Sequence, residues 1–109
     1  MTMQTSPEKI LELERLLKAV ASEPRLLILE WLKDPASSMP PQQLGDPDIH
    51  GACNQFIAEK LGFAGPTVSR HLKVLVDAGL IVGTRRKGWT FYRRHEANID
   101  RLKNLIGQL

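Results

Sequence analysis

Apolar residues recur at helical spacing near both ends of the chain. The spacing predicts one helix over 7–21 and another over 95–108, because residues three and four apart share a helix face. Ser6 and Pro7 are typical of a helix N-terminus and mark the start of the first. The apolar positions of the two helices are Ile10, Leu13, Leu17 and Val20, then Ile99, Leu102, Leu105, Ile106 and Leu109. One small core cannot easily cover both stripes, so they are either paired within one chain or covered by a second copy.

The segment from Arg25 to Leu32 is apolar on nearly all sides and predicts a helix at the buried centre of a domain. The chain between Asp34 and Gly51 differs, because it contains four prolines and two glycines and has no periodic apolar pattern. It predicts a long loop over 34–51. Loops of this length are unusual in a small domain and are often functional.

A helix, a short turn, a second helix and a hairpin follow. The first helix is expected over 52–61, with Phe56, Ile57 and Leu61 facing inward. Gly62 ends it, and Pro66 falls in the first turn of the next helix, which runs to Ala78. The inward face of this second helix is predicted to be Val68, Leu72, Leu75 and Val76. Strands at 80–82 and 89–94, joined by a turn at Lys87 and Gly88, complete a pattern that predicts a helix-turn-helix over 52–78 and a wing over 80–94.

The fold class that these elements predict is mostly α with a small β-hairpin: a winged helix-turn-helix of about five helices and a two-stranded antiparallel wing. The chain of 109 residues fits a single domain over 1–109. One cysteine excludes an internal disulfide framework. Neither a leader nor a membrane-length apolar run is visible, so we expect a cytoplasmic protein.

Charge is distributed unevenly along the chain. The net charge is +3, but the segment 66–94 contains seven basic residues and one acidic residue, a net charge of +6, while the rest has eight basic and eleven acidic residues. Such asymmetry is typical of a surface that meets phosphate. The alternative is a solvated positive face without a partner.

The second helix of a helix-turn-helix enters the DNA major groove, and its wing reaches phosphates or the minor groove. The predicted DNA contacts on this helix and on the wing are Thr67, Ser69, Arg70, His71, Lys73, Arg85, Arg86, Lys87 and Tyr92. Arg70 is suited to reading guanine, and the Tyr92 hydroxyl to a phosphate. Alternatives are open for four of them: Thr67 and Ser69 as residues of the helix start, His71 as a packed structural residue, and Tyr92 as part of the packing of the hairpin.

Several runs in this region resemble the ArsR-SmtB family of bacterial regulators. They are Ile57-Ala58-Glu59-Lys60-Leu61-Gly62, the run from Pro66 to Leu75 with its Ser-Arg-His-Leu segment, Ala78-Gly79-Leu80-Ile81, and the wing run from Arg86 to Arg93. Upstream, Ala21 to Leu29 resembles the start of the family's second helix. The resemblance covers about residues 8–108.

The resemblance implies a homodimer that pairs through its N- and C-terminal helices and binds an inverted-repeat operator in double-stranded DNA. It also implies a repressor that an effector releases. One departure is that Ala64 and Gly65 replace the serine and polar residue that family members commonly have there. The loss of a capping side chain costs on the order of 1 kcal/mol of helix stability, and we expect an operator that differs from those of relatives.

The metal sites of the family cannot be transferred to this chain. One needs two closely spaced thiols, and only Cys53 is present; the other needs a second histidine in the last helix, which has only His95 beside Glu96 and Asp100. No cofactor is therefore expected. A cluster of Asp46, Asp48, His50 and Cys53 offers ligand types that suit zinc. A thiol at a helix N-terminus is also more reactive than a free one, which makes Cys53 a redox candidate. An organic effector, or none, is the remaining alternative.

Catalysis is not expected, because the chain has no glycine-rich phosphate loop, no nucleophile elbow and no spaced acid–base set. The competing hypothesis to a DNA-binding regulator is a winged-helix module that binds protein or RNA without operator binding. The basic wing favours nucleic acid.

Overall fold

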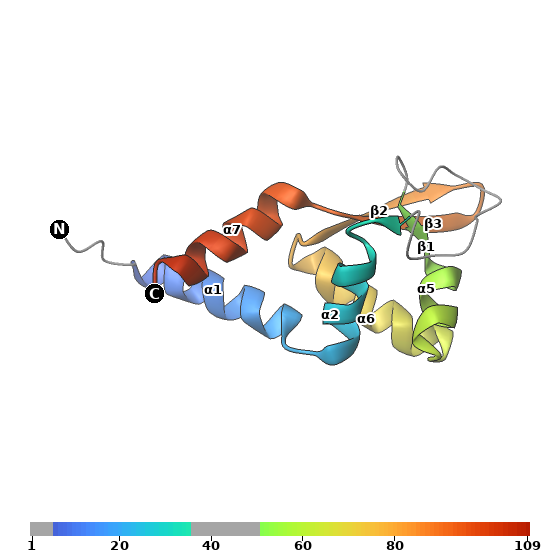
Figure 1. The fold of residues 1–109 in the computed structure, drawn as a ribbon, viewed down its shortest axis with the longest axis horizontal. Coiled ribbons are helices and arrows are strands. Elements are labelled where there is room, and N and C mark those ends of the chain that lie inside the picture. The colour runs from blue at the N-terminus through green and yellow to red at the C-terminus, as the bar shows by residue number, and fades with distance from the viewer. Residues whose placement is uncertain (1–5, 36–50) are drawn as a thin grey trace.

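The two terminal helices lie side by side at one end of the molecule, and a small sheet lies at the other (Figure 1). The structure is a computed structural model that describes residues 6–35 and 51–109. Its elements, in chain order, are α1 Pro7–Val20, α2 Glu23–Trp31, β1 Ala52–Cys53, α5 Asn54–Leu61, α6 Gly65–Asp77, β2 Ile81–Arg86, β3 Trp89–Arg94 and α7 Glu96–Gly107. The predicted loop over 34–51 lies almost entirely outside the described residues.

Local sequence explains where the first two helices begin. The Ser6 hydroxyl accepts a hydrogen bond from the Lys9 amide at 3.3 Å, and the Ser22 hydroxyl accepts one from the Arg25 amide at 3.4 Å. Each serine is followed within two residues by a proline, which is tolerated in a first helical turn because it has no amide to leave unpaired. The predicted bounds of both helices agree with the structure to within two residues.

The core is formed by residues of all five described helices and of the sheet. Its largest fully buried side chains are Phe91, Ile28, Ile57, Leu72, Leu75, Leu80, Leu105 and Val68. Two predictions of burial are wrong. Leu26 is 52% exposed, because α2 is covered by α1 and α6 but not on all sides, and Val76 is 38% exposed, because it falls beside the stripe that α6 buries.

The sheet has three strands in the order β1-β3-β2, all antiparallel. The wing strands β2 and β3 lie where the sequence predicts them, although β2 continues to Arg86. The prediction of helix at residues 52 and 53 is wrong: Ala52 pairs with Tyr92, and Cys53 pairs with Phe91. This pairing joins residues far apart in the chain, and a local hydrophobic pattern carries no sign of it.

Lys87 and Gly88 form the tip of the hairpin, with φ values of 51° and 84°. Two successive residues with positive φ are typical of the two-residue turns that join antiparallel strands. Among residues 6–35 and 51–109, no helix has the length and apolar character needed to cross a membrane.

Replacing Gly51 with alanine is expected to destabilise the protein through β1. Gly51 has φ +86°, and an added Cβ would clash with the carbonyl oxygen of Tyr92. We expect Gly51→Ala to lower the free energy of unfolding by roughly 2–4 kcal/mol, from left-handed backbone strain and overpacking together.

Gly62→Ala is the matched control. Gly62 also has a positive φ of 73°, but an added Cβ would meet nothing within 4 Å. Gly62→Ala is expected to lower the free energy of unfolding by roughly 1 kcal/mol, from left-handed backbone strain alone. Urea unfolding of both variants measures the difference, and equal losses would contradict the close approach of Gly51 to β3.

Candidate nucleic-acid interface

The N-terminal half of α6 presents a polar face to solvent. Val68, Leu72 and Leu75 are buried on one side of this helix, which turns Ser69, Arg70 and Lys73 outward, while Thr67 is half-buried. Ala64 occupies the N-cap position and its side chain makes no capping hydrogen bond, as the sequence predicts. The start of α6 therefore presents small, exposed side chains to whatever approaches.

Lys73 has a neighbour of opposite charge on its own helix. Its Nζ lies 2.9 Å from Oδ2 of Asp77, and both side chains are well exposed. An exposed pair at this spacing contributes only about 0.3–0.5 kcal/mol. Lys73 can therefore exchange Asp77 for a phosphate at little energetic cost.

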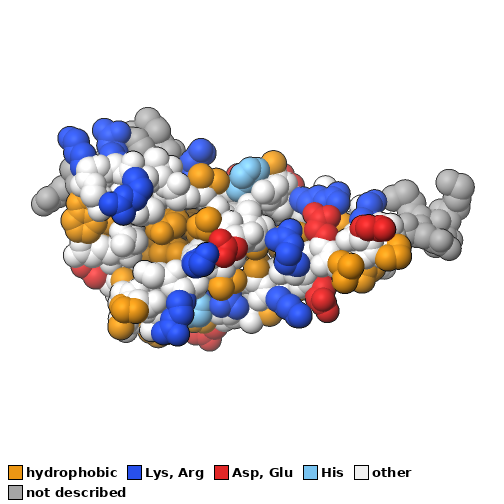
Figure 2. Space-filling model, turned by 180° about the vertical axis from the view of Figure 1, so that it is seen from behind, with side chains coloured by type: hydrophobic (Ala, Val, Ile, Leu, Met, Phe, Trp, Pro, Cys, Tyr) orange, Lys and Arg blue, Asp and Glu red, His pale blue; other side chains and the backbone are white. Residues whose placement is uncertain are grey.

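Three exposed basic residues surround the tip of the wing: Arg85, Arg86 and Lys87. Arg85 lies opposite Thr90 and Arg86 lies opposite Trp89 in the β2–β3 register, and Lys87 belongs to the turn itself. Figure 2 shows Lys and Arg side chains gathered at the end of the molecule that carries the wing. A hairpin with charge at its tip can follow a phosphate backbone.

Tyr92 lies in β3, the middle strand, and not at the tip of the wing. It is opposite Gly83 on one side and Ala52 on the other. A Cβ at Gly83 would be 3.2 Å from Cε1 of the tyrosine ring, so the ring covers this glycine. Burial raises the pKa of the Tyr92 hydroxyl above its ordinary value of 10.0, which keeps the group protonated at neutral pH.

His71 contacts side chains of its own chain, Arg25 on α2 and Phe63 in the turn before α6. It is half-buried, its ring centroid lies 6.5 Å from that of Phe63, and its Nδ1 lies 3.0 Å from Nη1 of Arg25. The other predicted contacts on α6 have no comparable link to α2 among the described residues. Of the two interpretations left open by the sequence, this geometry favours the packed structural residue.

Arg25 was missed by the sequence analysis as a residue of this site. Its guanidinium donates to the carbonyl oxygens of Ala19 at 2.6 Å and Lys18 at 3.3 Å, in addition to its contact with His71. The signal was present: Arg25 is the only basic residue in the largely apolar helix α2. A charge in such a helix has to be paired.

Arg94 contributes to the +6 segment but is not available to a ligand. Its side chain is only 7% exposed; Nη1 donates to the carbonyl oxygen of Leu29 at 3.1 Å, and Nε donates to Glu96 at 2.7 Å. Arg94 links the end of β3 to α2 and to the start of α7. The basic surface is therefore smaller than the sequence count indicates.

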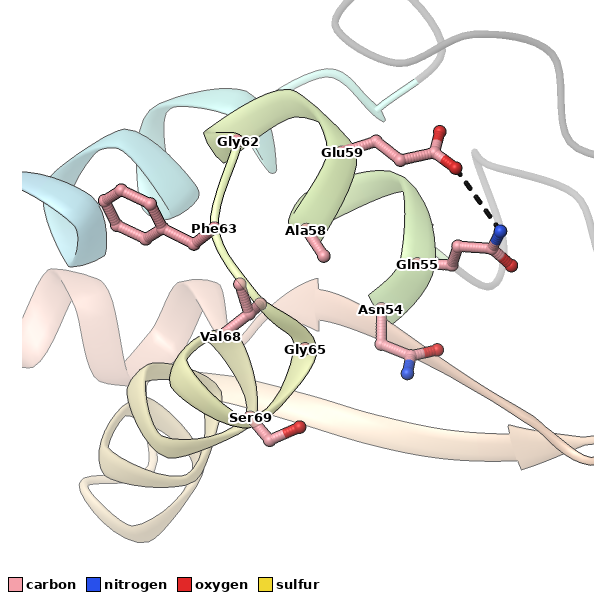
Figure 3. A pocket seen from close by; sticks show the side chains of 9 residues that line it. All are labelled: Asn54, Gln55, Ala58, Glu59, Gly62, Phe63, Gly65, Val68 and Ser69. Atoms are coloured by element: carbon pink, nitrogen blue, oxygen red, sulfur yellow. Dashed lines mark hydrogen bonds between the residues drawn. The ribbon is translucent and has the colours of Figure 1, made fainter.

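An open groove of about 460 Å³ lies between α5 and α6 (Figure 3). Asn54, Gln55 and Glu59 of α5 and Ser69 of α6 supply its polar rim, and Gln55 donates to Glu59 at 3.3 Å. Ala58 and Val68 supply apolar lining. Asn54 and Gln55 were not predicted to contribute to this surface, although polar residues in the first turn of a helix-turn-helix are a usable signal.

Only one member of the candidate metal cluster falls within the described residues. Asp46, Asp48 and His50 lie outside them. Cys53 is 5% exposed, belongs to β1, and its Sγ donates to Asn54 Oδ1 at 3.4 Å. Across residues 6–35 and 51–109, no group of three or more His, Cys, Asp or Glu side chains is arranged to hold a metal ion.

Comparison with known proteins agrees with this arrangement. The family model described as "Bacterial regulatory protein, arsR family" matches residues 52–82. An uncharacterised HTH-type transcriptional regulator of Bacillus subtilis (strain 168), YbzH, is 37% identical over 89 residues, which is 82% of this chain and 89% of the relative.

Solved structures show the same fold. The homodimeric winged helix-turn-helix DNA-binding domain of Mb0332 from Mycobacterium bovis has a TM-score of 0.63 and 26% identity, covering 98% of this chain and 87% of the other. The ArsR family transcriptional regulator RHA00566 has a TM-score of 0.68 and 16% identity, and the match covers 97% of this chain and 91% of the other.

Five described helices, a basic wing and a polar helix face define a transcriptional regulator with a winged helix-turn-helix DNA-binding fold. The two-stranded wing of the predicted fold is confirmed, with β1 as an additional strand. The chain belongs to the ArsR family of bacterial regulatory proteins, and it is not an enzyme.

Arg94→Met is expected to affect stability. The substitution removes the donor to Leu29, and we expect it to lower the free energy of unfolding by roughly 1–3 kcal/mol. Arg93→Met, at the exposed neighbouring position, should change it by less than about 0.5 kcal/mol. Thermal or urea unfolding measures both. A larger loss for Arg93→Met than for Arg94→Met would be inconsistent with the assigned role of Arg94.

Proposed function

We propose that this chain represses transcription as a homodimer that binds an inverted-repeat operator, with α6 in the major groove and the wing along the backbone. The observation that carries the proposal is the solvent-facing polar side of α6 in the same domain as a basic wing tip. A twofold dimer presents two such helices about one duplex turn apart, which matches an inverted repeat.

The contacts divide into two kinds. Thr67, Ser69 and Arg70 read base edges, because they lie in the first turns of α6 and their side chains donate or accept hydrogen bonds. Phosphates are bound by Lys73, Arg85, Arg86 and Lys87, with the Tyr92 hydroxyl as a further donor. Phosphate contacts set affinity and register, and base contacts set sequence choice.

Dimerisation is assigned to α1 and α7. Apolar side chains of these helices are exposed in the single chain, including Ile10, Leu11, Ile106 and Leu109. A groove of about 370 Å³ lies along α1 and reaches Leu109, and its lining is almost entirely apolar. A bidentate ion pair between Glu12 and Arg101, at 2.8 and 3.0 Å, ties the two helices together within one chain. The Mb0332 domain is described as homodimeric.

Four alternatives are open for the effector. They are a metal at Asp46, Asp48, His50 and Cys53, oxidation of Cys53, an organic ligand, and no effector at all. Cys53 is only 5% exposed, so an oxidant has little access to its thiol in this conformation.

Truncating the wing should reduce the salt dependence of DNA binding. Each phosphate contact that is lost lowers the slope of log K against log salt by about one. We expect the double variant Arg86→Gln and Lys87→Gln to lower the slope by about two in titrations with duplex DNA.

Lys33→Gln, exposed just after α2 and outside the wing and the two helices assigned to the dimer, is the control that keeps the slope unchanged. If the wild-type chain binds duplex DNA with no salt dependence, the protein- or RNA-binding alternative is favoured instead.

A charge in the α1 groove should convert the dimer to a monomer. Ile10 is 44% exposed in the single chain and lines the groove. Ile10→Lys is therefore expected to shift the mass measured by sedimentation from twice 12.3 kDa to 12.3 kDa at micromolar concentration, because dimerisation would have to remove a charged group from water.

Leu26→Lys is the matched control, since Leu26 is exposed to a similar extent, 52% against 44%, but lies on α2 outside the groove. A monomeric wild type, or loss of the dimer in Leu26→Lys alone, contradicts the assignment of the interface.

A further inference from the structure

Arg25 connects three helices through one guanidinium group. It lies in the first turn of α2, donates to the carbonyl oxygens of Lys18 and Ala19 at the end of α1, and contacts Nδ1 of His71 on α6. Carbonyl groups in the last turn of a helix have no partner within the helix, so Arg25 also satisfies the end of α1. The corner between α1 and α2 is thereby joined to α6.

This contact requires one particular form of His71. A guanidinium only donates hydrogen bonds and is always charged. Nδ1 of His71 must therefore accept, which leaves the imidazole neutral with its proton on Nε2. A protonated imidazole would place an N–H group and a second positive charge against Arg25 at 3.0 Å.

The surroundings of His71 favour the neutral form. The charged groups that act on it are Arg25 from α2 and Arg70 from α6 itself, and the ring of Phe63 lies nearby, tilted against the imidazole. Burial, followed by the charges of Arg25 and Arg70, holds the pKa of His71 below its ordinary value of 6.5. The unfolded chain therefore binds a proton more readily, and stability from this group is complete above pH 6.5 and declines as the pH falls.

We propose that Arg25 and His71 are a positioning pair that holds α6 against the α1–α2 corner, and that neutral His71 acts within the protein and not on DNA. The proposal rests on the proposed function of α6 as the helix that enters the major groove. Ser69 and Arg70 immediately precede His71, so a shift of α6 at this point moves the side chains that would read bases. Protonation of His71 breaks the pair and lowers operator affinity.

A DNA contact and a positioning role predict opposite effects of pH. If His71 touched a phosphate, its protonation would add an attraction, and binding would tighten as the pH falls. If it positions α6, protonation costs the contact with Arg25, and binding weakens. The sign of the His71 contribution therefore separates the two roles, which a loss of stability alone would not do.

Two substitutions isolate this contribution. In His71→Asn, the side-chain oxygen takes the place of Nδ1, so the variant keeps an acceptor for Arg25 and cannot titrate. In His71→Gln, the amide lies nearer the place of Nε2, so the acceptor is displaced. A further variant, His95→Asn, controls for the histidine that caps α7, where Nδ1 accepts from the Asn98 amide at 3.2 Å.

The experiment measures Kd by fluorescence anisotropy between pH 5.5 and 8, on a duplex that the wild-type chain selects from a randomised pool. At pH 8, we expect His71→Asn to bind within about threefold of wild type and His71→Gln to bind about tenfold more weakly, with the salt slope of both unchanged.

Below pH 6.5, the ordinary pKa of histidine, the Kd of the wild-type chain for DNA should rise relative to that of His71→Asn. The Kd of His95→Asn should change with pH in the same way as that of the wild-type chain. Wild-type binding that tightens relative to His71→Asn as the pH falls would overturn the proposal. Equal binding by wild type and His71→Gln at pH 8 would also overturn it.

The ¹⁵N NMR chemical shifts of the His71 imidazole test the contact between Arg25 and His71 in the free protein, without DNA. We expect a proton on Nε2 and none on Nδ1 at pH 8, and the opposite tautomer would overturn the pair even if every variant folded. A wild-type chain that selects no duplex but shows the expected tautomer would instead contradict the proposed function. The two failures are therefore distinguishable.

Discussion

The burial of one face of α6 is the constraint on which the rest of the structure depends. Val68, Leu72 and Leu75 are almost completely inaccessible, and each contributes roughly 1.5–3 kcal/mol through burial. Because these positions repeat at helical spacing, their burial sets the rotation of α6 about its axis. That rotation turns Ser69, Arg70 and Lys73 toward solvent. The side of α6 that faces solvent is therefore determined by the side that the core buries.

Polar side chains then fix how the layers around this core are joined. Arg25 joins α1 and α2 to α6, Arg94 joins β3 to α2 and α7, and Arg101 joins α7 to α1 through Glu12. In each case a guanidinium donates to carbonyl or carboxylate oxygens, or lies against a histidine nitrogen, across two or more elements. An arginine suits this role because its several donors point in fixed directions. Such links resist sliding between helices in a way that apolar contacts, which have no direction, do not.

These links also change the interpretation of the charge on this chain. In a sequence, a basic residue in a positive segment counts toward a phosphate-binding surface. In the structure, Arg94 serves the interior, while Arg85, Arg86 and Lys87 are on the surface of the wing. Local charge density therefore locates the wing correctly but overestimates the number of side chains that can meet a phosphate.

Local patterns in the sequence were sufficient for the helices, the helix-turn-helix and the hairpin. Helical spacing of apolar residues, serine and proline at helix starts and a Lys-Gly turn act within a few residues of one another, so a single sequence contains them. The family followed from motifs in the same segments. The polar face of α6 was also predictable, because the positions of Val68, Leu72 and Leu75 determine which residues lie opposite them.

Only the tertiary structure decided what depends on residues far apart in the chain. The pairing of Ala52 with Tyr92 converted an expected helix start into a third strand, and the exposure of Leu26 depends on which elements cover α2. His71 has the spacing of a DNA contact, and only its distance of 3.0 Å from Arg25, 46 residues earlier, favours a structural role within the protein. Periodicity reports which way a side chain points along its own element, but it carries no information on what another element places there.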